Sequence, residues 1–336
     1  MGLRFGSVDC EPLMFEWRDR SVLVTGATGI VGSWLCEALL SQGAAVVALV
    51  LDGDPRSRFF HEDIFEKCAI INGSLTDPAV CSRALNLHDV EVVFHLGAQT
   101  IVGAALRDPL ECFESNVRGT YNLLEAARRL PALASHIVVA SSDKAYGESP
   151  VLPYTEDMPL RGTHPYDVSK SCADLISVAY ARTYGLRVAV ARCGNVYGGG
   201  DLNWSRIVPG TIRSFSRGER PILRSDGSPT RDYLFVRDVV RGYIALAEQL
   251  DRPGVAGEAF NFAPQSEVSA IEMVRAIRRV MDVGLEPEIL GTAKFEIERQ
   301  TLDATKARRI LGWSAEYDLD AGLHETVEWY LRYLAC

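Results

Sequence analysis

The stretch VLVTGATGIVGSWLCEALL, residues 22–40, decides the fold of this chain. An apolar, β-branched run predicts a buried strand, and the segment after it has the apolar spacing of a helix. Gly26, Gly29 and Gly32 fall at the junction, where glycines allow a tight turn, backbone approach to a pyrophosphate and close helix–strand packing. The helix N-terminus then offers free N–H groups to phosphates. The stretch therefore predicts a dinucleotide-binding unit, with a purely structural turn as the alternative.

Short apolar runs and helical patterns alternate through the first half of the chain. Strands are expected at residues 21–26, 44–52, 68–73, 90–97, 136–142 and 187–195. Most of these runs are apolar on both faces, as in a parallel sheet covered by helices on each side. The repetition predicts an α/β fold, a doubly wound parallel sheet of the Rossmann type.

The pattern changes after residue 198, where a loop-like segment, GGGDLNWSRIVPG (198–210), precedes short strands and two helices near 237–250 and 268–282. We expect residues 18–198 to form the dinucleotide-binding Rossmann domain with the catalytic residues. Residues 199–336 are expected to form a smaller mixed α/β substrate domain, although the segment 237–262 should return to the Rossmann sheet.

Composition excludes several classes of protein. The 336 residues are 47% hydrophobic and 24% charged, and the net charge of −9 argues against a nucleic-acid partner. The eight cysteines form no C-x-x-C pair, and the histidines lack the spacing of metal ligands, so no metal is expected. The sequence has no run of 18 apolar residues and no signal-peptide pattern. We therefore expect a cytoplasmic protein without a membrane anchor.

The second strand ends in Asp52, whose carboxylate could accept hydrogen bonds from an adenosine ribose. This residue favours NAD over NADP. Arg56 and Arg58 lie downstream and could instead favour a 2′-phosphate. NAD is preferred on these residues, and NADP stays open.

Polar side chains close the fifth strand in VVASSDKAYGE (138–148), and YDVSK (166–170) follows in a helical segment. Tyr166 and Lys170 are one helical turn apart and share a face. A nearby ammonium lowers the pKa of a phenol, and the hydroxyl of Ser142 could bond the same substrate oxygen. These residues predict a catalytic site, with a surface pair on a helix as the alternative.

The G-x-x-G-x-x-G spacing together with Tyr166-x-x-x-Lys170 resembles the extended short-chain dehydrogenase/reductase family, from about residue 18 to the C-terminus. The segments SSDKAYG, PYDVSK and CGNVYGGGDLNWSRIVP more narrowly resemble nucleotide-sugar 4,6-dehydratases, above all the CDP-glucose type. The resemblance implies a lyase with tightly held NAD+ that is regenerated in each turnover. Such an enzyme oxidises a hexose at C4, eliminates water across C5–C6 and forms a 4-keto-6-deoxy sugar nucleotide.

The resemblance also implies roles for the polar residues. Ser142, Tyr166 and Lys170 match the triad that oxidises the sugar hydroxyl. The two residues after the triad hydroxyl supply the elimination, Asp143 as acid at the C6 hydroxyl and Lys144 as base at C5. An ordinary ion pair between Asp143 and Lys144 is the alternative.

Further positions are carried over from the family pattern. The expected cofactor contacts are Gly26, Thr28, Gly29, Ile30, Val31, Gly32, Asp52, Ser74, Leu75, Leu96, Gly97, Gln99, Tyr166, Lys170, Cys193 and Val196. The expected substrate contacts are Gln99, Asn195, Arg206, Arg231 and Glu296. The planar guanidinium groups suit a diphosphate, although Arg231 could instead pair with Asp232. Asn116 is expected to be a structural cap between helix and sheet.

Three other functions stay open: a nucleotide-sugar 4-epimerase of the same family, a non-catalytic NAD-binding regulator, and an NADP-dependent ketoreductase. The epimerase would need the triad and NAD but no acid and base after the hydroxyl. The expected partners are a nucleotide-diphosphate hexose and a second copy of the chain. The long helices expected at 104–131 and 166–184 correspond to those that build a four-helix dimer interface in the family.

Overall fold

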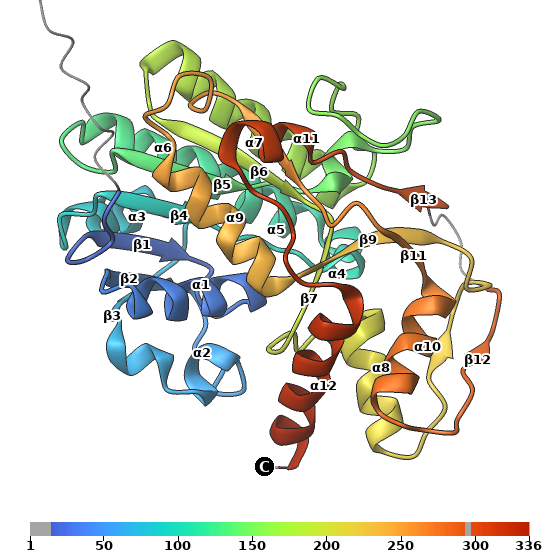
Figure 1. The fold of residues 1–336 in the computed structure, drawn as a ribbon. Coiled ribbons are helices and arrows are strands. Elements are labelled where there is room, and N and C mark those ends of the chain that lie inside the picture. Colours follow the sequence, from blue (N-terminus) through green and yellow to red (C-terminus); the bar gives the residue numbers. More distant parts are fainter. Residues whose placement is uncertain (1–14, 293–296, 336) are drawn as a thin grey trace, which may run out of the picture.

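The computed structural model describes residues 15–292 and 297–335. Within this part of the chain, the central feature is a seven-stranded parallel sheet with strand order β10-β6-β5-β4-β1-β2-β3 (Figure 1). The strands are β1 (Ser21–Thr25), β2 (Ala45–Val50), β3 (Ala69–Asn72), β4 (Val92–His95), β5 (His136–Ala140), β6 (Val188–Cys193) and β10 (Ala259–Phe262). The order reverses between β1 and β4, which confirms the doubly wound α/β fold.

Helices cover both faces of this sheet, as the apolar character of its strands requires. One face packs against α1 (Ile30–Ser41), α9 (Val236–Glu248) and α11 (Thr305–Leu311). The other packs against α3 (Pro78–Asn86), α6 (Gly119–Arg129) and α7 (Pro165–Tyr184). The sheet therefore has a separate core on each face. Because its strands are parallel, their carboxyl ends all lie at one edge.

The segment around residues 236–262 returns to the sheet. Helix α9 packs on the same face as α1, and β10 pairs in parallel with β6 through Phe260↔Ala191. Chain order and spatial order therefore differ in this region. The division of the chain into two domains at residue 198 stays a prediction.

The smaller part lies beside the carboxyl edge of the sheet (Figure 1). Its strands are β7 (Asn195–Tyr197), β8 (Ile222–Leu223), β9 (Thr230–Phe235), β11 (Glu267–Ser269), β12 (Glu288–Ile289) and β13 (Arg299–Gln300). Three helices share its core, α8 (Ile207–Ser216), α10 (Ala270–Val280) and α12 (Leu319–Ala335). Strand β9 pairs with β7, β11 and β13, so it links segments that are far apart in the sequence.

Two expected segments differ from the structure. The segment 198–210 is loop-like only up to Arg206, because α8 begins at Ile207 and accepts Pro209 in its first turn, where no N–H is needed. The helix expected at 104–131 is divided into α4 (Val102–Arg107), α5 (Pro109–Phe113), the π-helical η2 (Glu114–Arg118) and α6. Asp108 caps α5 and Pro109 cannot continue α4, so the break lies between them.

Short helical segments complete the fold. They are α2 (Arg58–His61), η1 (Ile64–Lys67) and η3 (Asp143–Tyr146). Among the described helices, none is long and apolar enough to cross a membrane. The described residues also contain no cluster of three or more His, Cys, Asp or Glu side chains placed to hold a metal ion.

Candidate active site

A cavity of about 940 Å³ opens where the carboxyl ends of the central strands meet the smaller part. Its walls come from the glycine loop before α1, from η3 and α7, and from β7, α8 and β9. The five residues expected to be catalytic all line it: Ser142, Asp143, Lys144, Tyr166 and Lys170. A crevice at the switch point of a doubly wound sheet is the usual ligand site of this fold.

The glycine loop fits a dinucleotide. Gly26 has a φ of +72°, and a Cβ there would lie 2.8 Å from the backbone nitrogen of Gly97. A Cβ on Gly32 would lie 2.1 Å from the carbonyl oxygen of Gly26, so α1 packs directly on the loop. The N-terminus of this twelve-residue helix faces the cavity with no side chain capping it. Its free N–H groups and partial positive charge suit a pyrophosphate.

Both arginines that could favour a 2′-phosphate are engaged elsewhere. Arg56 pairs with Asp54 at 2.9 Å. The buried guanidinium of Arg58 pairs with Glu37 at 2.7 Å and with Glu62 at 2.8 Å. These pairings agree with the preference for NAD.

Nine of the described residues that line the cavity are expected cofactor contacts outside the catalytic group: Gly26, Thr28, Gly29, Ile30, Val31, Gly32, Leu96, Cys193 and Val196. Five other expected contacts are not among the described lining residues: Asp52, Ser74, Leu75, Gly97 and Gln99. Asp52 is exposed just beyond the end of β2. Ser74 bonds Thr76 at 2.8 Å, and Leu75 packs beneath Gly97.

The side chain of Gln99 is turned onto its own loop, where its Oε1 accepts from the N–H of Ile101 at 2.8 Å. The backbone of Gln99 is held by Asn116, whose Oδ1 accepts from its N–H at 2.7 Å. Asn116 also donates to Ser169 of α7 at 2.8 Å. Asn116 therefore links the β4 loop to α7, which confirms the expected structural role.

Three polar residues meet at the end of β5. The hydroxyl of Ser142 accepts from the backbone N–H of Lys144 at 3.2 Å and donates to Oδ1 of Asp143 at 3.0 Å. Asp143 is only 4% exposed although it lines the cavity. The turn η3 thus fixes the hydroxyl, the carboxyl group and the start of the Lys144 side chain together.

Tyr166 and Lys170 lie side by side on α7, but their electrostatics differ from the expectation. Burial raises the pKa of Tyr166 to about 12, and the hydrogen bond with Ser142 offsets the rise only in part. Burial lowers the pKa of Lys170 to about 8, and its Nζ donates to the carbonyl oxygen of Ala140 at 2.9 Å. Burial of the phenol therefore outweighs the groups that lower its pKa, and Lys170 is not among the groups that change this pKa most.

Behind η3 lies a buried polar network. The hydroxyl of Tyr146, the last residue of the turn, donates to Asn261 at 2.8 Å and accepts from Arg192 at 2.7 Å. Arg192 forms a two-point ion pair with Asp174 of α7, at 2.8 and 2.9 Å. The turn is therefore fixed to β6, β10 and α7 by residues that are not among the described lining of the cavity.

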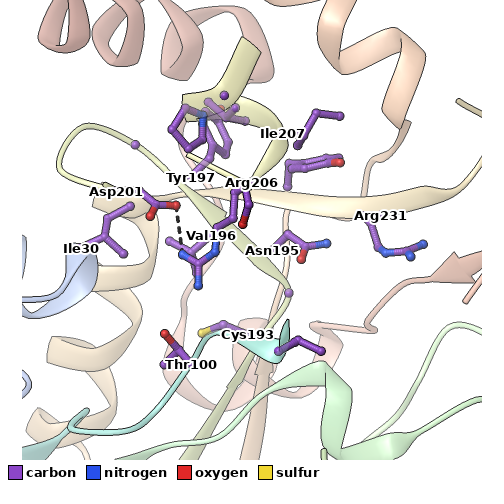
Figure 2. A pocket seen from close by; sticks show the side chains of 18 of the residues that line it. Ile30, Thr100, Cys193, Asn195, Val196, Tyr197, Asp201, Arg206, Ile207 and Arg231 are labelled. Carbon is purple, nitrogen blue, oxygen red and sulfur yellow. Dashed lines mark hydrogen bonds and ion pairs between the residues drawn. The ribbon is translucent and has the colours of Figure 1, made fainter. Parts of the chain in front are cut away.

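The substrate side of the cavity is rich in arginine. Figure 2 shows Asn195 between Arg206 and Arg231. Arg231 donates to the carbonyl oxygen of Thr230 at 2.7 Å, while Asp232 accepts from the N–H of Leu302 at 2.7 Å. The expected alternative, an Arg231–Asp232 ion pair, does not occur among the described residues, because neighbouring side chains on a strand point to opposite faces. Glu296 lies outside the described residues.

Several lining residues were missed from the sequence. Three further arginines among the described residues line the same cavity, Arg213, Arg220 and Arg224. The sequence could have predicted them, because arginines recur between residues 206 and 231 although the chain has a net charge of −9. Asp201, which pairs with Arg206 at 3.0 Å (Figure 2), had no such signal.

The loop at residues 198–201 carries Asp201 and is held from two sides. Trp34 of α1 donates to the carbonyl oxygen of Gly199 at 2.8 Å. Tyr330 of α12 donates to the carbonyl oxygen of Asp201 at 2.7 Å. A Cβ on Gly199 would lie 2.3 Å from the ring of Trp329, so this loop and α12 are in direct contact.

Comparison with known proteins places this geometry in a family. The CDP-glucose 4,6-dehydratase of Salmonella typhimurium is 30% identical, over 95% of this chain and 92% of that protein. The UDP-glucose 4-epimerase of Mycolicibacterium smegmatis is 33% identical, over 92% and 97%. The structure of dTDP-glucose 4,6-dehydratase from Bacillus anthracis in complex with NAD is 25% identical, with a TM-score of 0.81 over 93% of this chain and 97% of that one.

The family model supports the same conclusion. The model of the NAD dependent epimerase/dehydratase family matches residues 22–263, which include the glycine loop, η3, α7 and β9. The match covers most of the chain and every residue expected to be catalytic. The protein belongs to the NAD dependent epimerase/dehydratase family, the extended short-chain dehydrogenase/reductases that act on nucleotide sugars.

Proposed function

We propose that this enzyme is an NAD-dependent nucleotide-diphosphate-glucose 4,6-dehydratase that prefers CDP-glucose. The observation that carries the proposal is the pair Asp143–Lys144, which directly follows Ser142 and lines one cavity with Tyr166 and Lys170. An oxidation alone needs no such pair, whereas elimination of water needs an acid and a base. The 30% identity to a CDP-glucose 4,6-dehydratase supports the choice of nucleotide.

The first step is oxidation at C4. The glycine loop with Gly26, Gly29 and Gly32 would hold NAD, which would supply the chemistry of hydride transfer between C4 and C6. Tyr166 takes the proton of the C4 hydroxyl as the phenolate, a form that burial alone disfavours and that positive charge at the site must stabilise, and Ser142 orients that oxygen. Lys170, held by the carbonyl oxygen of Ala140, lies on the same face of α7 and provides positive charge beside the phenol.

The second step is elimination. The ketone at C4 makes the C5 proton acidic, and Lys144 removes it as a base. Asp143 gives a proton to the C6 hydroxyl, which leaves as water. Lys144 then returns the proton to C5 as C6 is reduced. The proton that Tyr166 took from the C4 hydroxyl balances the one that Asp143 gave up, so its return to Asp143 restores both residues for the next turnover.

The arginines on the substrate side supply recognition of the diphosphate. A guanidinium presents a planar pair of donors to phosphate oxygens. The described arginines that line the cavity are Arg206, Arg213, Arg220, Arg224 and Arg231. Their positive charge in an acidic chain supports an anionic substrate bound locally.

The test uses CDP-, dTDP-, UDP- and GDP-glucose carrying deuterium at C4. We expect a 4-keto-6-deoxy product from CDP-glucose at the highest kcat/KM, with the label recovered at C6. Mass spectrometry and proton NMR of the product locate the label. No product from any of the four nucleotides would contradict the proposal.

A 4-epimerase is the second candidate, because the chain is 33% identical to a UDP-glucose 4-epimerase. In that case the label returns to C4 with inverted configuration and no water is lost. The position of the deuterium therefore separates the two reactions within one experiment.

We also propose that the enzyme is a homodimer through the helices α4 to α7. Large apolar side chains are exposed on this side of the molecule, among them Leu106 (55%), Leu110 (68%) and Leu175 (60%). Helices α4, α5 and α6 all pack against α7, so these side chains belong to one helical layer. Burial of such a surface against a second copy would remove it from water.

Leu175→Arg should convert the dimer to a single chain, because a charge at the centre of an apolar interface cannot be solvated. Sedimentation velocity measures the change as a halving of the native mass. The matched control is Leu331→Arg on α12, which is also exposed (46%) but lies outside this helical layer. Equal masses for Leu175→Arg and the unmodified protein would contradict the proposed interface.

A further inference from the structure

We propose that Gln300 is a positioning residue for Lys144: its uncharged amide oxygen holds the amine at the cavity without stabilising the ammonium as a carboxylate would. The proposal rests on the proposed function of Lys144 as the C5 base. Gln300 belongs to β13, and its Oε1 accepts a hydrogen bond from Nζ of Lys144 although the two residues are 156 positions apart. It is only 1% exposed and does not belong to any of the sequence motifs discussed above.

The backbone around Gln300 is fixed, so its amide has a defined position. Strand β13 runs parallel to β9 with Gln300 opposite Arg231. The next residue accepts from the N–H of Tyr154 at 2.8 Å, and the one after donates to Asp232 at 2.7 Å. A buried side chain on such a segment can orient its partner accurately.

Chemistry explains why an amide suits this place. A base must lose its proton, and a neutral amine keeps two N–H donors and one lone pair. One N–H can still donate to the amide oxygen while the lone pair faces the substrate. A carboxylate at the same place would favour the ammonium and oppose the reaction.

Other titratable and charged groups lie around Lys144, and both negative and positive charges therefore act on its amine together with the amide of Gln300. Asp143 precedes Lys144 on η3. Burial raises the pKa of Asp167 on α7, and the nearby charge of Lys144 lowers this pKa in part. On β9, Arg231 lines the cavity, and burial raises the pKa of Asp232 to about 7, with the charge of Asp143 adding to it. Tyr154 lies within hydrogen-bonding reach of Gln300, and Arg299 precedes it on β13.

One neighbouring feature supports an oriented amide. The Nε2 of Gln300 is buried and, within the described part of the chain, makes no hydrogen bond of ordinary geometry, although Tyr154 lies within reach. A buried donor without a well-formed hydrogen bond costs free energy, and the bond between the amide oxygen and Lys144 offsets part of that cost. A leucine of similar volume would avoid that cost but could not hold the amine.

The test measures the titration of Lys144 directly, without a sugar nucleotide. The full-length holoenzyme is pulse-labelled with isotopic acetic anhydride from pH 6 to 11, and mass spectrometry quantifies the peptide that contains Lys144. In Gln300→Glu we expect the midpoint to rise by about one to two pH units. In Gln300→Leu we expect it to fall by about half a unit, because the amide oxygen bonds the ammonium more strongly than the amine.

The matched control is Gln42→Glu, which adds the same charge at the exposed end of α1 and should leave the midpoint unchanged. Thermal melting checks that each variant is folded. If Gln300→Glu does not fold, Gln300→Leu still tests the proposal. Midpoints of both Gln300 variants equal to that of the control would overturn the proposal.

The pH profile of dehydration links the contact to the reaction. In Gln300→Glu the rising limb of kcat should move to higher pH with the labelling midpoint, so that kcat at pH 7 falls about 10- to 100-fold while KM is unchanged. An equal loss at every pH would show a merely structural role and overturn the proposal. If the unmodified enzyme forms no 4-keto-6-deoxy product, the proposed function fails, but the labelling result still decides whether Gln300 controls Lys144.

Discussion

Lys144→Met should lower the rate of dehydration by a factor of about 10²–10⁴, which is the usual contribution of a positioned base. Methionine keeps the length and apolar stem of lysine but has no amine, so the C5 proton stays in place. Oxidation at C4 should continue, because Ser142, Tyr166 and Lys170 are untouched. The expected result is one equivalent of reduced NAD per active site, measured by its near-ultraviolet absorbance, with little final product.

The exposed residue Lys67 provides the control, since Lys67→Met removes the same group far from the cavity lining and should leave both steps unchanged. Asp143→Asn should also stall after oxidation, because an amide cannot protonate the leaving hydroxyl. Full dehydration by Lys144→Met would exclude Lys144 as the base. An unchanged 4-epimerase activity in this variant would favour the second candidate function.

Tyr166→Phe should stop the reaction one step earlier. The variant loses the hydroxyl that takes the C4 proton, and we expect both oxidation and dehydration to fall by a factor of about 10²–10⁴. No burst of reduced NAD should form in a single turnover. Rapid-mixing absorbance and product analysis measure the two steps separately.

Tyr184→Phe is the matched control, because Tyr184 lies on the same helix but is 56% exposed at its far end. It should retain full activity. A normal burst in Tyr166→Phe would mean that another group takes the C4 proton. Together, Tyr166→Phe and Lys144→Met divide the reaction into the part before the ketone and the part after it.

Local patterns predicted most of the fold. All six strands expected in the first half are present, because apolar β-branched runs bounded by glycine and polar residues define buried strands well. Helix α8 was missed because Pro209 and Gly210 suggest a loop, although proline is tolerated in a first helical turn. The break at Pro109 was missed because the apolar spacing continues across it.

The site was predicted where its residues are close in sequence or at helical spacing. Ser142, Asp143 and Lys144 are consecutive, and Tyr166 and Lys170 share a helix face, so the sequence predicts that each group stays together. Contacts such as Lys144–Gln300 and Asp201–Arg206 could not be predicted. These contacts depend on the tertiary placement of β13 beside β9 and of the loop at 198–201 beside α12. The periodicity of apolar residues in the sequence does not predict such placement.

Helix α12 contacts the loop at residues 198–201 through Trp329 and bonds it through Tyr330, which has a consequence for biosynthesis. The glycine loop, η3 and α7 are complete once the first 184 residues have left the ribosome. The loop with Asp201 gains the bond from Tyr330 only after residue 330 emerges, whereas Trp34, which also bonds this loop, is made early. Both sides of the cavity therefore depend on late segments of the chain, the dinucleotide side on β6 and α9 and the opposite wall on α12, so the complete site forms only when synthesis is almost finished.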